Sequence, residues 1–240
     1  MPIESNQPFT GKSAFAHKGG VHVNAMLKNA KTYEHIKPGT VGNRTRFLIS
    51  ELSGKSNILV KSDELHLGLS KDKAETRVIL EKIQDLENQG YQFEAAEASF
   101  ELLMKKEVGR YKKFFLVKTA QVLTEDIGAG ASRSKASVKL EVDGKETDGI
   151  QEGDGPVDAL YKAVVAALIE SYPVIKEIHL TDYKVRVVNP QDGTAAKVRV
   201  FIQFQDKEGN AWTTVGVDED VIEASWKALV DAIEYKLLKS

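Results

Sequence analysis

The most informative absence in the chain of 240 residues is cysteine, of which it has none. Without thiols the chain can form neither disulfides nor thiolate metal sites. No run of apolar residues approaches the 18 or so that a membrane-spanning helix needs. The first residues, "MPIESNQPF", lack the charged end and apolar run of a signal peptide. We therefore predict a cytoplasmic protein with no membrane partner.

Excess charge is the second absence. The net charge is only −2, so no general basic field would attract nucleic acid, and we predict no nucleic-acid partner. Hydrophobic residues make up 42% and charged residues 28%, which is ordinary for a globular protein. A chain of this length can build one large domain or two modest ones.

The first half of the chain has helical periodicity. Apolar residues recur at helical spacing over 45–67, and "KDKAETRVILEKIQDLENQG" (71–90) and "FEAAEASFELLMKKEVG" (93–109) each end at a glycine. These segments are typical of amphipathic packing helices.

After Arg110 the pattern changes to alternation. We predict a strand over 112–124, a small-residue loop over 126–134, and a hairpin with its turn at Asp143-Gly144. A helix over 155–173 follows, with Pro156 in its first turn.

The same order then recurs as a strand over 177–189, a hairpin over 196–217 and a helix over 220–238. "LYKAVVAAL" (160–168) aligns with "SWKALVDAI" (225–233), so Lys162 matches Lys227. We predict an α+β fold in which helical N-terminal subdomains, 1–50 and 51–113, precede a pseudo-symmetric repeat of two βββα units over 114–240.

Two stretches are candidates for chemistry. In "AFAHKGGVHVNA" (14–25), His17 and His22 are five positions apart with glycines between them, and no carboxylate falls within 12–33. A self-contained metal site is therefore disfavoured. A glycine-hinged loop that presents an imidazole for acid–base work remains open, as does a turn with solvated histidines. In "DGIQEGDGPVDA" (148–159), a glycine-rich loop leads into a helix start, which predicts either an anion site or plain helix capping.

Three longer stretches carry a resemblance. The segment 7–58, with "AFAHKGGVH", "TYEHIKPGTVGN" and "SELSGKSNI", resembles the part that follows the catalytic barrel in the citramalate synthase branch of the isopropylmalate/homocitrate synthase family. Residues 86–106 resemble the next helical subdomain of that branch. Residues 114–240, with "GDGPVDA", resemble its C-terminal regulatory domain, which is an allosteric dimerisation domain.

The resemblance implies an acyltransferase that condenses acetyl-CoA with a 2-oxo acid. The family's catalytic TIM barrel, which holds a divalent metal, is absent from this sequence, so we expect a fragment that is inactive alone, with no cofactor and no metal ligand of its own. By motif position His22 and Tyr33 are the catalytic residues that this part lends to the barrel of a homodimer's other protomer. "HVNA" after the glycines, where the isopropylmalate branch commonly has "HQDG", favours pyruvate as acceptor.

The resemblance also implies that the C-terminal domain binds an end product, isoleucine or leucine. The expected effector-binding residues are Gly153, Asp154, Gly155, Pro156, Val157 and Tyr161. Two other interpretations stay open: the same region of a 2-isopropylmalate synthase of leucine biosynthesis, and a stand-alone amino-acid-binding dimer.

Overall fold

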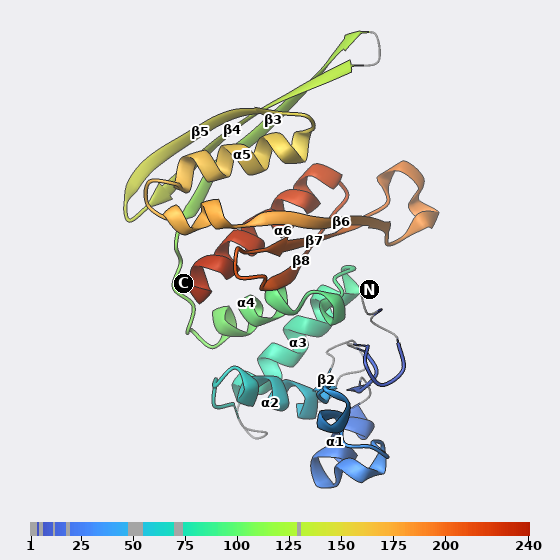
Figure 1. Cartoon of the computed structure of the whole chain (residues 1–240). Coiled ribbons are helices and arrows are strands. Elements are labelled where there is room, and N and C mark those ends of the chain that lie inside the picture. Colours follow the sequence, from blue (N-terminus) through green and yellow to red (C-terminus); the bar gives the residue numbers. More distant parts are fainter. Residues whose placement is uncertain are drawn as a thin grey trace. The chain divides into compact units, whose positions relative to one another are not determined.

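The computed structural model describes residues 4, 7–11, 13–17, 20–47, 55–69, 74–128 and 131–240. The chain divides into two compact units (Figure 1). The first unit comprises Met1–Glu94 and Met104–Gly109, and the second comprises Ala95–Leu103 and Arg110–Ser240. The predicted border at residue 50 lies outside the described residues, and the three-part division of the sequence stays a prediction.

The first unit is mainly helical. Its elements are β1 (Ala16–His17), α1 (Gly20–Lys28), η1 (Ala30–Thr32), η2 (Pro38–Val41), β2 (Arg46–Phe47), α2 (Lys55–Glu64), α3 (Ala74–Asn88) and η3 (Phe93–Ala95). Helix α4 (Glu97–Glu107) has residues in both units. Strands β1 and β2 pair in parallel, so Phe47 belongs to a strand and not to the helical run predicted from it. Ile79 and Ile83 of α3 are buried, as helical spacing predicts, whereas Val78, expected on the same apolar stripe, is 53% exposed.

The first βββα unit is formed by β3 (Leu116–Gly128), β4 (Ala131–Val142), β5 (Lys145–Gly153) and α5 (Pro156–Leu168). The predicted turn at Asp143-Gly144 is confirmed, because both residues have positive φ, 48° and 78°, as a two-residue hairpin requires. The predicted loop over 126–134 is wrong for its described residues. Residues 126–128 continue β3 and residues 131–134 continue β4, and the two strands pair as an arm that projects past the end of α5 (Figure 1).

The second βββα unit has the same order. It consists of β6 (His179–Val187), β7 (Val198–Gln205), β8 (Ala211–Asp218) and α6 (Val221–Lys239). Each βββα unit contains an antiparallel three-stranded sheet whose strands follow the order of the sequence, β3-β4-β5 in the first and β6-β7-β8 in the second. Short 3-10 helices, η4 (Pro173–Glu177) and η5 (Pro190–Ala195), lie on either side of β6 in the sequence. The predicted α+β class and the repeat of two βββα units are confirmed.

In the second compact unit of the chain, both βββα repeats share one hydrophobic core. Buried side chains of α5, α6, β4, β7 and β8 form one cluster, in which the rings of Tyr161 and Phe204 lie 5.4 Å apart. Each helix approaches its sheet so closely that only glycine fits at one strand position. A Cβ on Gly149 would lie 1.9 Å from the carbonyl oxygen of Ala163, and one on Gly216 would lie 2.0 Å from that of Ala224. The repeat in the sequence is therefore a repeat of the packing.

None of the described helices is long and apolar enough to cross a membrane.

Candidate functional site

His22 lies on a helix and not on the glycine-hinged loop that was one of the predictions. Helix α1 begins at Gly20, so no glycine interrupts it, and His22 is its third residue. Val23 and Met26 are buried on the packed side of α1, whereas the side chain of His22 is exposed. Glycine is well tolerated at a helix start, where the first N–H groups have no intrahelical partner. The backbone that carries the His22 imidazole is therefore helical.

Tyr33 lies directly against His22. Their ring centroids are 4.2 Å apart and the ring planes are inclined by 25°, which is a stacked arrangement. The turn after α1 produces this contact: Asn29 caps η1 by accepting from Lys31 N at 3.1 Å, and Tyr33 follows η1 directly. Tyr33 is 44% exposed. The structure therefore brings the two predicted catalytic residues together at the surface of the first unit.

His17, whose role the sequence left open, has a carboxylate partner. Its Nε2 is 3.3 Å from Oε1 of Glu34, and Thr45 Oγ1 donates to the same oxygen at 2.7 Å. Glu34 is only 8% exposed. Sequence reasoning missed Glu34 because it considered carboxylates only within 12–33, and Glu34 is the next residue along the chain. His35, the next residue, instead lies edge-on to the ring of Phe9.

The predicted effector-binding residues lie at the start of α5. Gly155 is the N-cap and offers no side-chain hydrogen bond, and Pro156 occupies the first helical turn. Asp158 turns back instead: its Oδ2 accepts from Asp154 N at 3.1 Å and from Lys162 Nζ at 2.7 Å. The start of α5 therefore carries its own carboxylate in the first turn, where the helix dipole favours one.

Two of these residues have packing roles. A Cβ on Gly153 would lie 2.4 Å from Ala159 N, so the strand can pass the helix only as glycine. The hydroxyl of Tyr161 donates to the carbonyl oxygen of Ile178 at 2.9 Å. Burial raises the pKa of Tyr161 to about 12, so the hydroxyl stays protonated at neutral pH.

The corresponding helix start in the second repeat is capped by side chains. Asp220 is the N-cap of α6 and accepts from Ile222 N at 2.7 Å. Asp218 accepts from Asp220 N at 3.0 Å and from Lys227 Nζ at 2.6 Å. The hydrogen bond from Lys227 lowers the pKa of Asp218.

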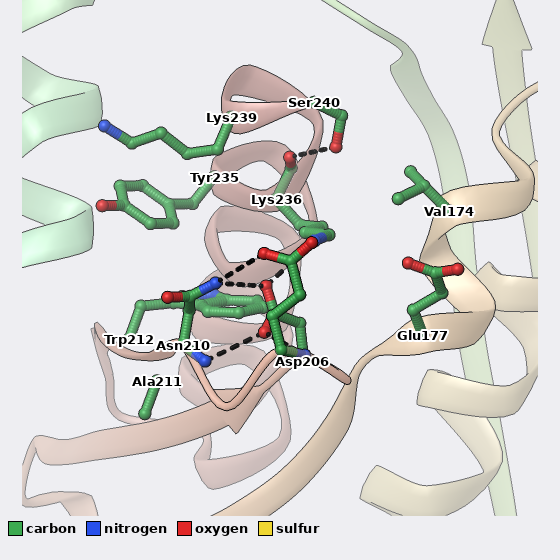
Figure 2. A pocket seen from close by; sticks show the side chains of 11 residues that line it. Val174, Glu177, Asp206, Asn210, Ala211, Trp212, Tyr235, Lys236, Lys239 and Ser240 are labelled. Atoms are coloured by element: carbon green, nitrogen blue, oxygen red, sulfur yellow. Dashed lines mark hydrogen bonds and ion pairs between the residues drawn. The ribbon is translucent and has the colours of Figure 1, made fainter.

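A cavity of about 510 Å³, which sequence reasoning did not anticipate, lies beside the β7–β8 turn and the last turns of α6 (Figure 2). Trp212 and Tyr235 supply aromatic surface. The Asp206 carboxylate accepts from Lys236 Nζ at 3.1 Å and from Asn210 N at 2.9 Å. Burial raises the pKa of Asp206, but these hydrogen bonds outweigh it, and the net shift is downward. The protein itself uses this carboxylate to hold the turn.

No metal site is evident in the described part of the chain, because no three His, Asp or Glu side chains converge there. His17 contacts one carboxylate and His22 contacts a tyrosine ring, which is not a ligand set for a divalent cation.

Comparisons with known proteins cover both units. Residues 94–237 match the family described as the LeuA allosteric (dimerisation) domain. Residues 9–91 match the family described as homocitrate synthase post-HMGL domain-like.

Curated relatives align along nearly the whole chain. This chain is 49% identical to the (R)-citramalate synthase of Geobacter sulfurreducens over 98% of the residues of this chain. It is 48% identical to the (R)-citramalate synthase of Aquifex aeolicus over 100% of them. It is 30% identical to the 2-isopropylmalate synthase of Rhodopseudomonas palustris over 97%. The chain spans less than half the length of these relatives: 44%, 45% and 41%.

Proposed function

Because this chain belongs to the LeuA allosteric (dimerisation) domain family, we propose that it is the accessory and feedback-regulatory part of an (R)-citramalate synthase. The observation that carries the proposal is the high identity to citramalate synthases along nearly the whole chain, well above that to a 2-isopropylmalate synthase. The short span relative to those proteins supports a division of labour, in which catalysis needs a part that this sequence does not contain. Alone, the chain is expected to have no synthase activity.

The reaction proposed for the whole enzyme is a condensation of acetyl-CoA with pyruvate. The methyl group of the acetyl thioester loses a proton, and its carbon forms a bond to the ketone carbon of the 2-oxo acid. The resulting alkoxide takes up a proton, and water cleaves the thioester to release CoA and citramalate. A divalent metal, assigned to the catalytic barrel, would polarise the ketone. Among the described residues of this chain, no three His, Asp or Glu side chains converge to form a site for it.

His22 is proposed to contribute acid–base chemistry or to polarise the thioester carbonyl, with Tyr33 as a hydrogen-bonding partner. Support comes from the exposure of both residues at the surface of the first unit and from their stacked contact. A homodimer follows from this role, since the residues act outside their own chain.

The test restores the catalytic part and replaces His22 by alanine. Turnover should fall by roughly 10²–10⁴-fold, which is typical of a lost acid–base group. His179→Ala, which removes an exposed histidine of β6, serves as the matched control and should leave turnover unchanged. A His22→Ala enzyme with the parent rate would remove the catalytic assignment.

Feedback is proposed to act through isoleucine bound near Gly153, Asp154, Gly155, Pro156, Val157 and Tyr161. The N-cap of α5 is a glycine and brings no side chain, whereas α6 is capped by Asp220, although Asp158 places a carboxylate in the first turn of α5. Calorimetric titration with isoleucine should give one site per chain. Leucine is the control titrant, and binding of leucine alone would favour the 2-isopropylmalate alternative. Absence of heat with either amino acid would contradict the regulatory proposal, and binding without any effect on a restored catalytic part would favour the stand-alone amino-acid-binding dimer.

A further inference from the structure

Glu34 is an unusual residue for the small first unit. Among the residues described in that unit, no other carboxylate is buried. Burying a carboxylate is costly unless donors compensate for the lost water. Its partners include the hydroxyl of Thr45 at 2.7 Å and the imidazole of His17 at 3.3 Å, both on Oε1. The carboxylate therefore holds neighbouring side chains in place.

What it fixes is the orientation of the His17 ring. A hydrogen bond from Nε2 to Oε1 requires a proton on Nε2, which restricts both the tautomer and the rotation of the ring. Held in this way, the ring lies 6.2 Å from that of Phe47 and 6.3 Å from that of Tyr33, centroid to centroid. His17 is thus clamped between a strand residue and the tyrosine.

Tyr33 in turn stacks on His22 at 4.2 Å, so the contacts run from Glu34 to His17, to Tyr33 and to His22. We propose that Glu34 is a positioning residue that acts through His17 to hold Tyr33 and His22 in place. The inference rests on the proposed function, because it takes His22 as the group that serves the reaction. Glu34 itself touches neither His22 nor any reacting atom.

A simpler interpretation is that Glu34 only ties the short β1–β2 pair to the turn after α1. Thr45 immediately precedes β2 and His17 ends β1, so the same hydrogen bonds would serve that purpose. The two interpretations differ in whether the loss of the Glu34 carboxylate changes the position of the His22 ring. A clamp of the strands would alter stability and the signals of His17, while leaving the His22 ring where it is.

The experiment uses the whole 240-residue chain with ¹⁵N-labelled histidine. Nitrogen shifts report the tautomer of His17, and the ring-proton shifts of His22 report its stacking on Tyr33. Tyr33→Leu calibrates the second signal, because it removes the ring current altogether. Glu64→Gln is the matched control: Glu64 is an exposed carboxylate of α2 that pairs with Lys61 in the same unit.

Glu34→Leu should abolish the Nε2–H preference of His17 and move the His22 signals most of the way to their positions in Tyr33→Leu. Glu34→Gln keeps an oxygen acceptor and should restore most of both signals. The control should change neither. If Glu34→Leu changes the His17 signals but leaves those of His22 at the parent position, the positioning role is wrong.

Should Glu34→Leu fail to fold, His17→Leu decides, because it removes the imidazole but keeps an apolar side chain between Phe47 and Tyr33. An unshifted His22 in that variant would overturn the proposal. A kinetic measurement tests the catalytic role of His22 separately from the positioning role of Glu34. With the catalytic part restored, Glu34→Leu should lower kcat on the order of 10- to 100-fold with KM little changed. An unchanged kcat alongside a displaced His22 would refute the catalytic role of His22 and leave the positioning intact.

Discussion

The two βββα halves of the second unit share their packing and differ at their edges. In both, a glycine of the third strand meets the helix backbone, Gly149 against Ala163 and Gly216 against Ala224. The first half has strands of 13 and 12 residues that run out into an arm, whereas the second has strands of 9 and 8. The shared core contact is what the repeat had to keep in order to bury one helix on each sheet. The edges were free to diverge toward different tasks.

The largest expected effect tests the shared contact. Gly149→Ala and Gly216→Ala each place a Cβ about 2 Å from a helix carbonyl oxygen, and backbone cannot yield as a side-chain tip does. Each variant should lower the free energy of unfolding by about 3 kcal/mol or more, by overpacking. Urea denaturation followed by circular dichroism measures this. Gly39→Ala, where a Cβ would meet nothing within 4 Å, is the control, and a clear difference between the two halves would break the comparison.

A second effect concerns the edge strand β8 of the second half. The N–H of Val215 on the outer strand β8 donates to Ser99 Oγ at 3.0 Å, and Ser99 donates to Asp231 Oδ2 at 2.7 Å. Ser99→Ala leaves a buried N–H without its acceptor and should cost about 1–3 kcal/mol in denaturant unfolding. Ser137→Ala, on the exposed face of β4, is the matched control. Equal small losses in both variants would remove the distinction between the edges.

Features that depend on local sequence were predictable, whereas features that depend on pairing between strands were not. The Asp143-Gly144 turn, the start of α5 at Pro156 and the α6 repeat were predictable because each depends on a local backbone preference or on periodicity. The arm over 126–134 was mistaken for a loop because small residues hide the alternation, while pairing with the neighbouring strand maintains the structure.

The candidate site was predictable only as a set of residues. Motif position gave His22 and Tyr33, but their stacking depends on η1, and Glu34 reaches His17 only through folding. Similarly, nothing in the local sequence links Ser99 to Val215, which are 116 positions apart. Contacts of this kind follow from tertiary packing and not from propensity.

The third prediction uses the two hairpin turns. The first half turns at Asp143-Gly144 by backbone conformation, whereas the second is held by the Asp206 carboxylate, whose pKa is lowered below the ordinary 3.8. A lowered folded-state pKa contributes stability that is present above the unfolded value and is lost as pH falls through the folded one. Asp206→Asn should therefore flatten the fall in unfolding free energy below about pH 4. Asp143→Asn, which tolerates positive φ, should leave stability at neutral pH unchanged.

The smallest effect separates the two aligned lysines. Lys227 bonds Asp218 at 2.6 Å and also donates to the carbonyl oxygen of Val217 at 3.2 Å, whereas Lys162 bonds Asp158 one helical turn away. Lys227→Met should lower the free energy of unfolding by up to about 1 kcal/mol, and the loss should shrink in high salt. Lys162→Met should change it too little to resolve, because both members of the Lys162–Asp158 pair are well exposed. Paired urea titrations at low and high salt measure this. Equal losses would mean that the hydrogen bonds of Lys227 add nothing to the start of α6 beyond what the exposed pair of Lys162 adds to the start of α5.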